Sequence, residues 1–129
     1  MKAWLLALAG AVLALPGVCA ADARLEASLR RLEPETRLEQ VCDIAVMQRI
    51  RADSSPYRPD KVLAAARAEP RLTGDTLDSV GGAFRSGGQW YQVTFECQAT
   101  PDRMHVLSLN YTIGALIPES DWDNFGLYP

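Results

Sequence analysis

The sequence predicts an α+β fold in which N-terminal helices pack on one face of a curved antiparallel sheet of three to four strands. Apolar residues recur at helical spacing from residue 23 to about residue 70, and they alternate with polar residues from 71 to 117. Cys42 falls on the apolar face of an expected helix, and Cys97 falls on the apolar face of an expected strand. A bond between the two would join helix to sheet, as a two-layer fold requires.

Three helices are expected in the first half of the chain. The first covers 23–32, where leucines stand at i, i+4 and i+7. Pro34 suits the first turn of a second helix, which should extend to Arg51. The apolar face of this helix consists of Leu38, Val41, Cys42, Ala45 and Val46. Arg49 lies on the same stripe, so that end should emerge toward solvent or pair with an acid. A third, alanine-rich helix is expected over Pro59–Ala68, where Glu69-Pro70 stops it.

The second half predicts strands. Gln89–Ala99 and Met104–Ile113 alternate in polarity and are joined by a turn at residues 100–103, so they should form an antiparallel hairpin. The apolar face of the later strand is expected to carry His105, Leu107, Leu109, Tyr111 and Ile113. Weaker strands over Arg71–Leu77 and Gly82–Arg85 should flank a turn at 79–82.

A short C-terminal helix is expected within residues 117–126, because Pro118 suits its start and Gly126 suits the position past its end. This helix either closes the core through Trp122 and Phe125 or presents an acidic, aromatic surface to a partner.

The N-terminal residues have the pattern of an export signal. Lys2 precedes an apolar run, Pro16-Gly17 breaks it, and small residues follow, as in a cleaved secretory signal peptide over residues 1–20. Cleavage after Ala20 fits best, with Ala23 as the alternative. The residues before Cys19 do not favour a lipid anchor there, and no later stretch is long and apolar enough to span a membrane. Residues 21–129 should therefore form one α+β domain, with its compact part at about 32–127.

Composition suggests the compartment. Arginine outnumbers lysine 11 to 2 and alanine is abundant, a balance typical of GC-rich bacterial genomes. Together with the export signal, a bacterial origin predicts that the protein is periplasmic or secreted. Removal of the signal leaves two cysteines, an even count that reads as a disulfide in an oxidising compartment. A metal site of Cys42, Cys97 and His105, or two free thiols, are the alternatives, and the first lacks a close cysteine pair and a fourth ligand.

The charge pattern argues against a nucleic-acid partner. The net charge is −3, and the basic residues form no stripe along the sequence. Residues 21–71 carry 10 basic and 9 acidic side chains, whereas residues 72–129 carry 2 basic and 7 acidic ones. The acidic second half could face a basic partner or serve solubility alone.

Catalytic motifs are absent from the sequence. His105 is the one histidine, no serine lies in a G-x-S-x-G elbow, and no H-E-x-x-H or phosphate-binding glycine loop occurs. We therefore assign no catalytic residue, metal or cofactor, and favour a protein that is not an enzyme. A small hydrolase relying on His105 or on tail acids such as Asp121 is one alternative.

The polar face of the hairpin supplies a candidate binding surface. Its members, together with two tail residues, are Trp90, Gln92, Thr94, Asn110, Asp121 and Trp122. The favoured function is a non-enzymatic periplasmic interaction or envelope-accessory module, whose partner is a periplasmic or envelope protein or a small ligand. A small-ligand carrier or a protein inhibitor that uses the same face is the other alternative.

Several strings resemble an uncharacterised bacterial family, domain of unknown function 930. The most specific is Thr36–Asp43, which reads TRLEQVCD. Shorter matches are Tyr57–Asp60, Ala83–Arg85, Trp90-Tyr91, Phe95–Cys97, Ile113-Gly114 and Ile117-Pro118. The resemblance spans about Leu32 to Leu127 and implies an exported or envelope-associated protein of alphaproteobacterial type. Some relatives place this domain after a membrane anchor and a proline-rich linker, whereas we expect only a signal peptide before the domain here. The resemblance to this family implies no catalytic residue.

Overall fold

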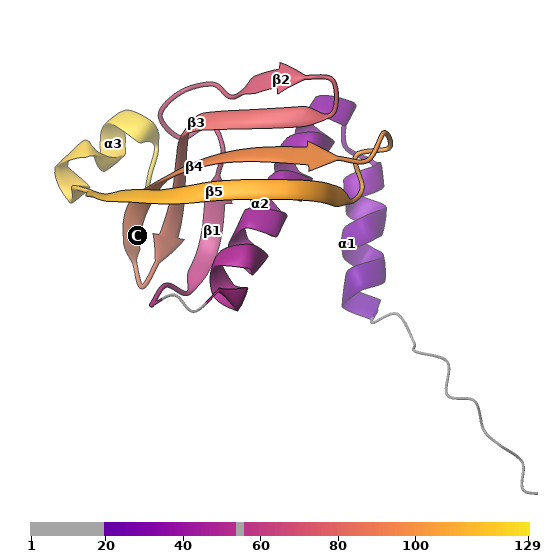
Figure 1. Cartoon of the computed structure of the whole chain (residues 1–129). Helices are drawn as coiled ribbons and strands as arrows, with labels where there is room; N and C mark the ends of the chain where they lie inside the picture. Colours follow the sequence, from indigo (N-terminus) through magenta and orange to yellow (C-terminus); the bar gives the residue numbers. More distant parts are fainter. Residues whose placement is uncertain (1–19, 54–55) are drawn as a thin grey trace, which may run out of the picture.

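A computed structural model describes residues 20–53 and 56–129, so the expected signal peptide, Cys19 included, falls outside the described residues except for Ala20. Two N-terminal helices precede an antiparallel sheet, and a short helix follows it (Figure 1). The helices and strands are α1 (Ala20–Arg30), α2 (Pro34–Ala52), β1 (Pro59–Leu63), β2 (Arg71–Thr73), β3 (Thr76–Ser86), β4 (Gln89–Ala99), β5 (Val106–Ile117), the 3-10 turn η1 (Glu119–Asp121) and α3 (Trp122–Phe125). This order and the disulfide confirm the α+β fold class. None of the described helices is long and apolar enough to cross a membrane.

The sheet is antiparallel throughout, with the spatial order β1-β3-β4-β5. Strand β2 pairs with the first residues of β3, on the same edge that β1 occupies further along. The described sheet thus has five strands instead of three or four. The expected turn at 79–82 is wrong, since β3 runs through it with a bulge between Ser79 and Gly82. Gly81 is required there, because a Cβ at this position would lie 2.5 Å from the backbone nitrogen of Ala68.

The helix expected over Pro59–Ala68 is also wrong. Pro59–Leu63 forms β1, whose residues pair with β3 from Ala83 to Ser86. Alanine favours helix over other residues by only a few tenths of a kcal/mol each, so an open sheet edge that offers hydrogen bonds readily overrides it. After β1 the chain turns over the bulge of β3, where the Ser79 hydroxyl donates a 2.7 Å hydrogen bond to the Ala64 carbonyl.

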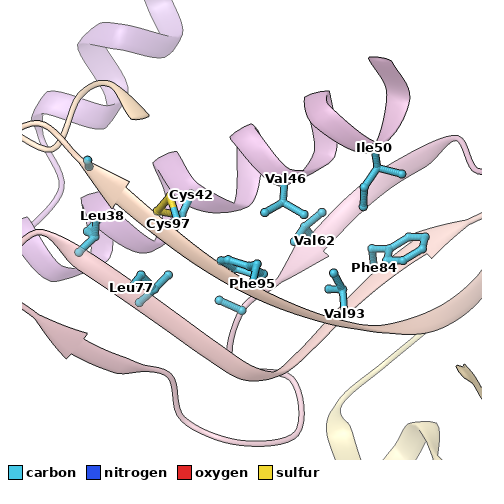
Figure 2. Close-up of a cluster of buried hydrophobic side chains, with 12 residues drawn as sticks. Leu38, Cys42, Val46, Ile50, Val62, Leu77, Phe84, Val93, Phe95 and Cys97 are labelled. Carbon is cyan, nitrogen blue, oxygen red and sulfur yellow. A yellow bond between two sulfur atoms is a disulfide. The ribbon is translucent and has the colours of Figure 1, made fainter. Parts of the chain in front are cut away.

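The main core lies between α2 and the inner face of the sheet (Figure 2). Four fully buried residues of α2, spaced four apart, point into it: Leu38, Cys42, Val46 and Ile50. The strands contribute Val62, Leu77, Phe84, Val93, Phe95 and Cys97. The Cys42–Cys97 disulfide crosses this layer with a Cα–Cα distance of 6.0 Å, and it joins residues 55 apart in the sequence. The predicted bridge between helix and sheet is confirmed.

A second, smaller core lies on the opposite, outer face of the sheet. The C-terminal segment folds back over one end of this face, so that Trp122 and Leu127 pack with Ala83, Trp90 and Ile117. Figure 1 shows α3 at this end of the sheet, far from α1. The tail helix therefore closes a core, which is the first of the two roles that the sequence predicts for it.

The expected apolar face of the last strand is right in its middle and wrong at its start. Leu109, Tyr111 and Ile113 pack against the main core, but Leu107 is 63% exposed and His105 is exposed. The pairing of β4 with β5 shifts register between Gln98 and Ala99. An extra residue on one strand reverses the facing of every side chain beyond it.

Removal of the bridge should destabilise the domain. We expect Cys42→Ala with Cys97→Ala to lower the free energy of unfolding by about 2–4 kcal/mol, because the unfolded chain regains the freedom of a long loop. Urea titration followed by tryptophan fluorescence measures the change, and wild-type protein with a reductant is the matched control. A loss below about 1 kcal/mol in both samples would show that the bridge does not support the fold.

Candidate functional site

The open part of the outer face of the sheet holds three of the residues expected to form a binding surface. Thr94 and Asn110 are exposed and Gln92 is half-buried, all beyond the part that the tail covers. One polar row crosses four strands in direct register: Arg71, Asp78, Glu96 and Asn110. Two carboxylates thus stand opposite each other on β3 and β4, a destabilising arrangement in a sheet. This face is open and acidic at its centre.

Trp90 and Trp122 are buried, unlike the other members of the expected binding surface. Trp90 does lie on the outer face, in alternation with Gln92 and Thr94, yet it is 0% exposed because the tail covers it. Its indole Nε1 donates a 2.8 Å hydrogen bond to the Tyr128 carbonyl, and that of Trp122 donates a 3.0 Å bond to the Ile117 carbonyl. Both indoles therefore hold the tail in place. Asp121 is half-buried beside them.

The residues of the hydrolase alternative are not brought together. His105 is exposed in the β4–β5 hairpin, and Asp121 follows the other end of β5. The 12 residues of β5 separate them, a span of about 40 Å at the usual strand rise. Within residues 20–53 and 56–129 no three His, Cys, Asp or Glu side chains are grouped to hold a metal ion. The described geometry thus shows no catalytic grouping around His105 or Asp121.

A groove runs between α2 and the free edge of β5. Its first part is a hollow of about 330 Å³ whose walls are one stripe of α2 and the start of β5. The α2 stripe consists of Ala45, Gln48, Arg49 and Ala52, and the β5 wall consists of Val106, Leu107, Ser108 and Leu109. Arg49 is exposed here and lies 3.8 Å from the Asp53 carboxylate, as the expected pairing of this end with an acid requires. The hydroxyl group of Tyr111 donates a hydrogen bond to the same carboxylate.

The groove widens toward the N-terminus into a wedge between α1 and α2. This second hollow is about 400 Å³ and shares Ala45, Gln48 and Val106 with the first. Its floor is apolar and consists of Leu25, Leu29, Val41, Ile44 and Met104, while Asp22, Glu26 and His105 stand at its rim.

Arg37 holds the turn between α1 and α2. Its guanidinium donates hydrogen bonds of 2.9–3.0 Å to the carbonyl oxygens of Leu29 and Arg30 at the end of α1 and of Leu32 in the turn that follows. It also donates a 3.0 Å bond to the Asp102 carbonyl of the hairpin. One side chain thus fixes α1 against both α2 and the hairpin, a role for which the sequence offers no periodic signal.

A family model described as Domain of Unknown Function (DUF930) matches residues 29–127, which is most of the chain. The chain belongs to this family. No curated protein and no solved structure matches it. The DUF930 match contains the whole sheet, α2 and the first part of the groove, whereas three residues of the wedge, Asp22, Leu25 and Glu26, precede it. The predicted resemblance is confirmed.

Sequence reasoning missed the groove of this DUF930 domain. Two signals could have indicated it. The first is a second helical stripe on α2, at residues 41, 45, 48 and 52, where small and polar side chains conceal the period. The second is that β5 contains neither a charged residue nor a proline along its 12 residues.

The two outer strands of the sheet differ sharply. Strand β1 is five residues long, begins with Pro59, and carries Asp60 and Lys61. Those are the features that protect sheet edges from other chains. Strand β5 is more than twice as long and lacks the charges and the proline, and no strand of the described chain pairs with its outer side. Of the two, β5 is therefore the edge open to another strand.

Asp43 is a buried acid on the other side of α2. It is 6% exposed, its Oδ1 has no hydrogen-bond partner, and it lines a small hollow with Gln40 and Lys61. Its pKa is raised to about 8, first by burial and then by the neighbouring Glu39, while the backbone N–H of Ala64 and the charge of Lys61 partly offset these two effects. The pKa of Glu39 is also raised, first by burial and then by Glu69.

These shifts predict a loss of stability with rising pH. A carboxyl group whose folded pKa exceeds its unfolded value favours the folded state while it is protonated, so this contribution declines as pH rises from about 4 to about 8. Asp43→Asn removes the ionisation. We expect it to stabilise the protein by about 2 kcal/mol more at pH 8 than at pH 5. Thermal unfolding at both values measures this, with the exposed Asp123→Asn as control. An equal effect of Asp43→Asn at both pH values would contradict the assignment.

Proposed function

We propose that this DUF930 protein is an exported, non-enzymatic binding module of the periplasm that takes up an extended segment of a partner polypeptide along β5. Its signal-like N-terminus supports export, and so does the disulfide, since such bonds persist in oxidising compartments.

The open edge of β5 carries the proposal. In an antiparallel pair half of a strand's backbone N–H and C=O groups point away from its neighbour. No strand of the described chain lies beside these groups on β5, and the side chains of β5 carry no charge that would repel one. A segment that adds to the edge gains main-chain hydrogen bonds, and pockets beside the edge select its side chains.

The dimensions of the edge set the length of the segment. Pairing between β4 and β5 is regular from Ser108 to Ile113, and register shifts bound this stretch on both sides. Six residues correspond to about 20 Å of strand. A six-residue segment would place alternate side chains in the groove against α2, near Ala45 and Ala52, and the others toward the polar outer face.

The groove favours a bare segment over a second copy of the chain. Helix α2 lines the groove along β5 on the inner side of the sheet. A second copy paired through its own β5 would bring its own α2 to the same side, where the two helices would compete for the groove. An extended segment without such a helix meets no obstacle.

Strand addition should be lost when the edge acquires a charge. We expect Leu107→Lys to weaken the binding of peptides selected from a random 12-residue phage library by tenfold or more, because Leu107 lines the groove directly beside the paired stretch and a lysine on an edge opposes pairing. Val80→Lys is the matched control, since Val80 is 61% exposed but lies on the outer-face bulge of β3. Fluorescence anisotropy of the labelled peptides measures both affinities.

The same preparation tests the remaining parts of the proposal. Protein secreted from the full-length gene should begin at Ala21 or Arg24. Three results would contradict strand addition: no enriched peptide, equal effects of both lysines, or a concentration-dependent dimer in light scattering that Leu107→Lys abolishes. The last result would identify a second copy as the occupant of β5.

A further inference from the structure

The wedge lies between α1 and α2, next to the first residue of β5. A segment added along β5 would enter the wedge if it continued beyond that residue. The two hollows form one continuous groove through Ala45, Gln48 and Val106. A segment that pairs from Ile113 back to Ser108 and extends by two or three residues reaches the wedge at about 3.3 Å per residue.

The wedge differs in chemistry from the rest of the groove. Its floor is formed by Leu29 and Met104, which are almost fully buried, together with Leu25, which is 43% exposed. A volume of about 400 Å³ is sufficient for a large apolar side chain, since it lies within the range of roughly 300–1,000 Å³ of ordinary ligand pockets.

The rim of the wedge is acidic. Asp22 and Glu26 stand one helical turn apart on α1, where like charges at i and i+4 repel each other. Glu26 shares its charge with Arg30 through an exposed 2.9 Å ion pair, but Asp22 forms no ion pair with any residue of the described chain. A cation placed above the wedge would be attracted chiefly to Asp22, in competition with the α-ammonium group that cleavage after Ala20 leaves on Ala21.

We propose that the wedge is a specificity pocket for a large apolar residue that stands next to a lysine or arginine in the partner segment. This inference rests on strand addition at β5 and names the partner's chemistry at one end of that segment. The apolar side chain fills the floor, while the basic side chain lies at the rim beside Asp22 and Glu26.

The inference depends on cleavage after Ala20, because cleavage after Ala23 would remove Asp22. The intact mass of the secreted protein decides this first. A mature chain that begins at Arg24 overturns the proposal in this form.

Selection from the random 12-residue library tests the partner's chemistry. We expect the enriched peptides to share a basic residue beside a leucine or an aromatic residue. The double substitution Asp22→Asn with Glu26→Gln should weaken the binding of these peptides three- to tenfold at low ionic strength, because it removes exposed charge pairs. At 0.5 M salt, which screens such pairs, the loss of affinity should be much smaller. Leu25→Gln should weaken them at both ionic strengths, because it removes part of the apolar floor.

Glu35→Gln is the matched control, since Glu35 is an exposed acid in the first turn of α2 outside the wedge. Binding that is abolished by Leu107→Lys but unchanged by the acid and Leu25 variants overturns the specificity pocket and leaves strand addition standing. If no peptide binding depends on Leu107, strand addition fails and the pocket fails with it.

Discussion

The disulfide between Cys42 and Cys97 determines where α2 can lie. Cys42 is in the middle of the helix and Cys97 is on β4, next to the edge strand, so the bond fixes the middle of the helix over this part of the inner face (Figure 2). The buried row of α2 then points at the sheet, and the adjacent stripe with Ala45 and Ala52 lies along β5. The groove is a consequence of this placement, since the helix covers the sheet up to its last strand but not the far side of that strand.

Covering of the sheet is unequal on its two faces. The inner face is buried under α2, while the outer face is buried only at the end where the C-terminal tail folds over Trp90. The remaining outer surface is polar and carries opposed carboxylates at Asp78 and Glu96. The edge of β5 thus lies between a partly apolar groove on one side and a hydrophilic surface on the other. A strand with alternating polarity is the complement of such an edge.

Much of this architecture follows from residue patterns alone. The period of α2, the alternation of β4 and the positions of the two cysteines suffice for the layer arrangement and the bridge. Trp90 shows where such reasoning ends. Its facing follows from alternation, but its burial depends on a segment more than 30 residues later that returns to cover it.

The remaining misassignments have the same origin. The β1 sequence has the composition of a short helix, and it becomes a strand because β3 offers an edge to pair with. The bulge that exposes Leu107 depends on the pairing of two strands, and neither sequence indicates it. The groove combines parts of α1, α2 and β5, each of which is unremarkable alone. Local period predicts elements, but contacts between distant segments decide which surfaces stay open.

Amide hydrogen exchange of the isolated monomer, resolved residue by residue by NMR, tests the open edge of β5 most directly. Within Ser108–Ile113 the amides that point toward β4 should be protected, and their alternate neighbours should exchange about tenfold faster or more. That alternation would show an edge ready to receive a strand. Uniform protection of all six amides in a monomeric sample would show that the edge is already covered and would contradict strand addition.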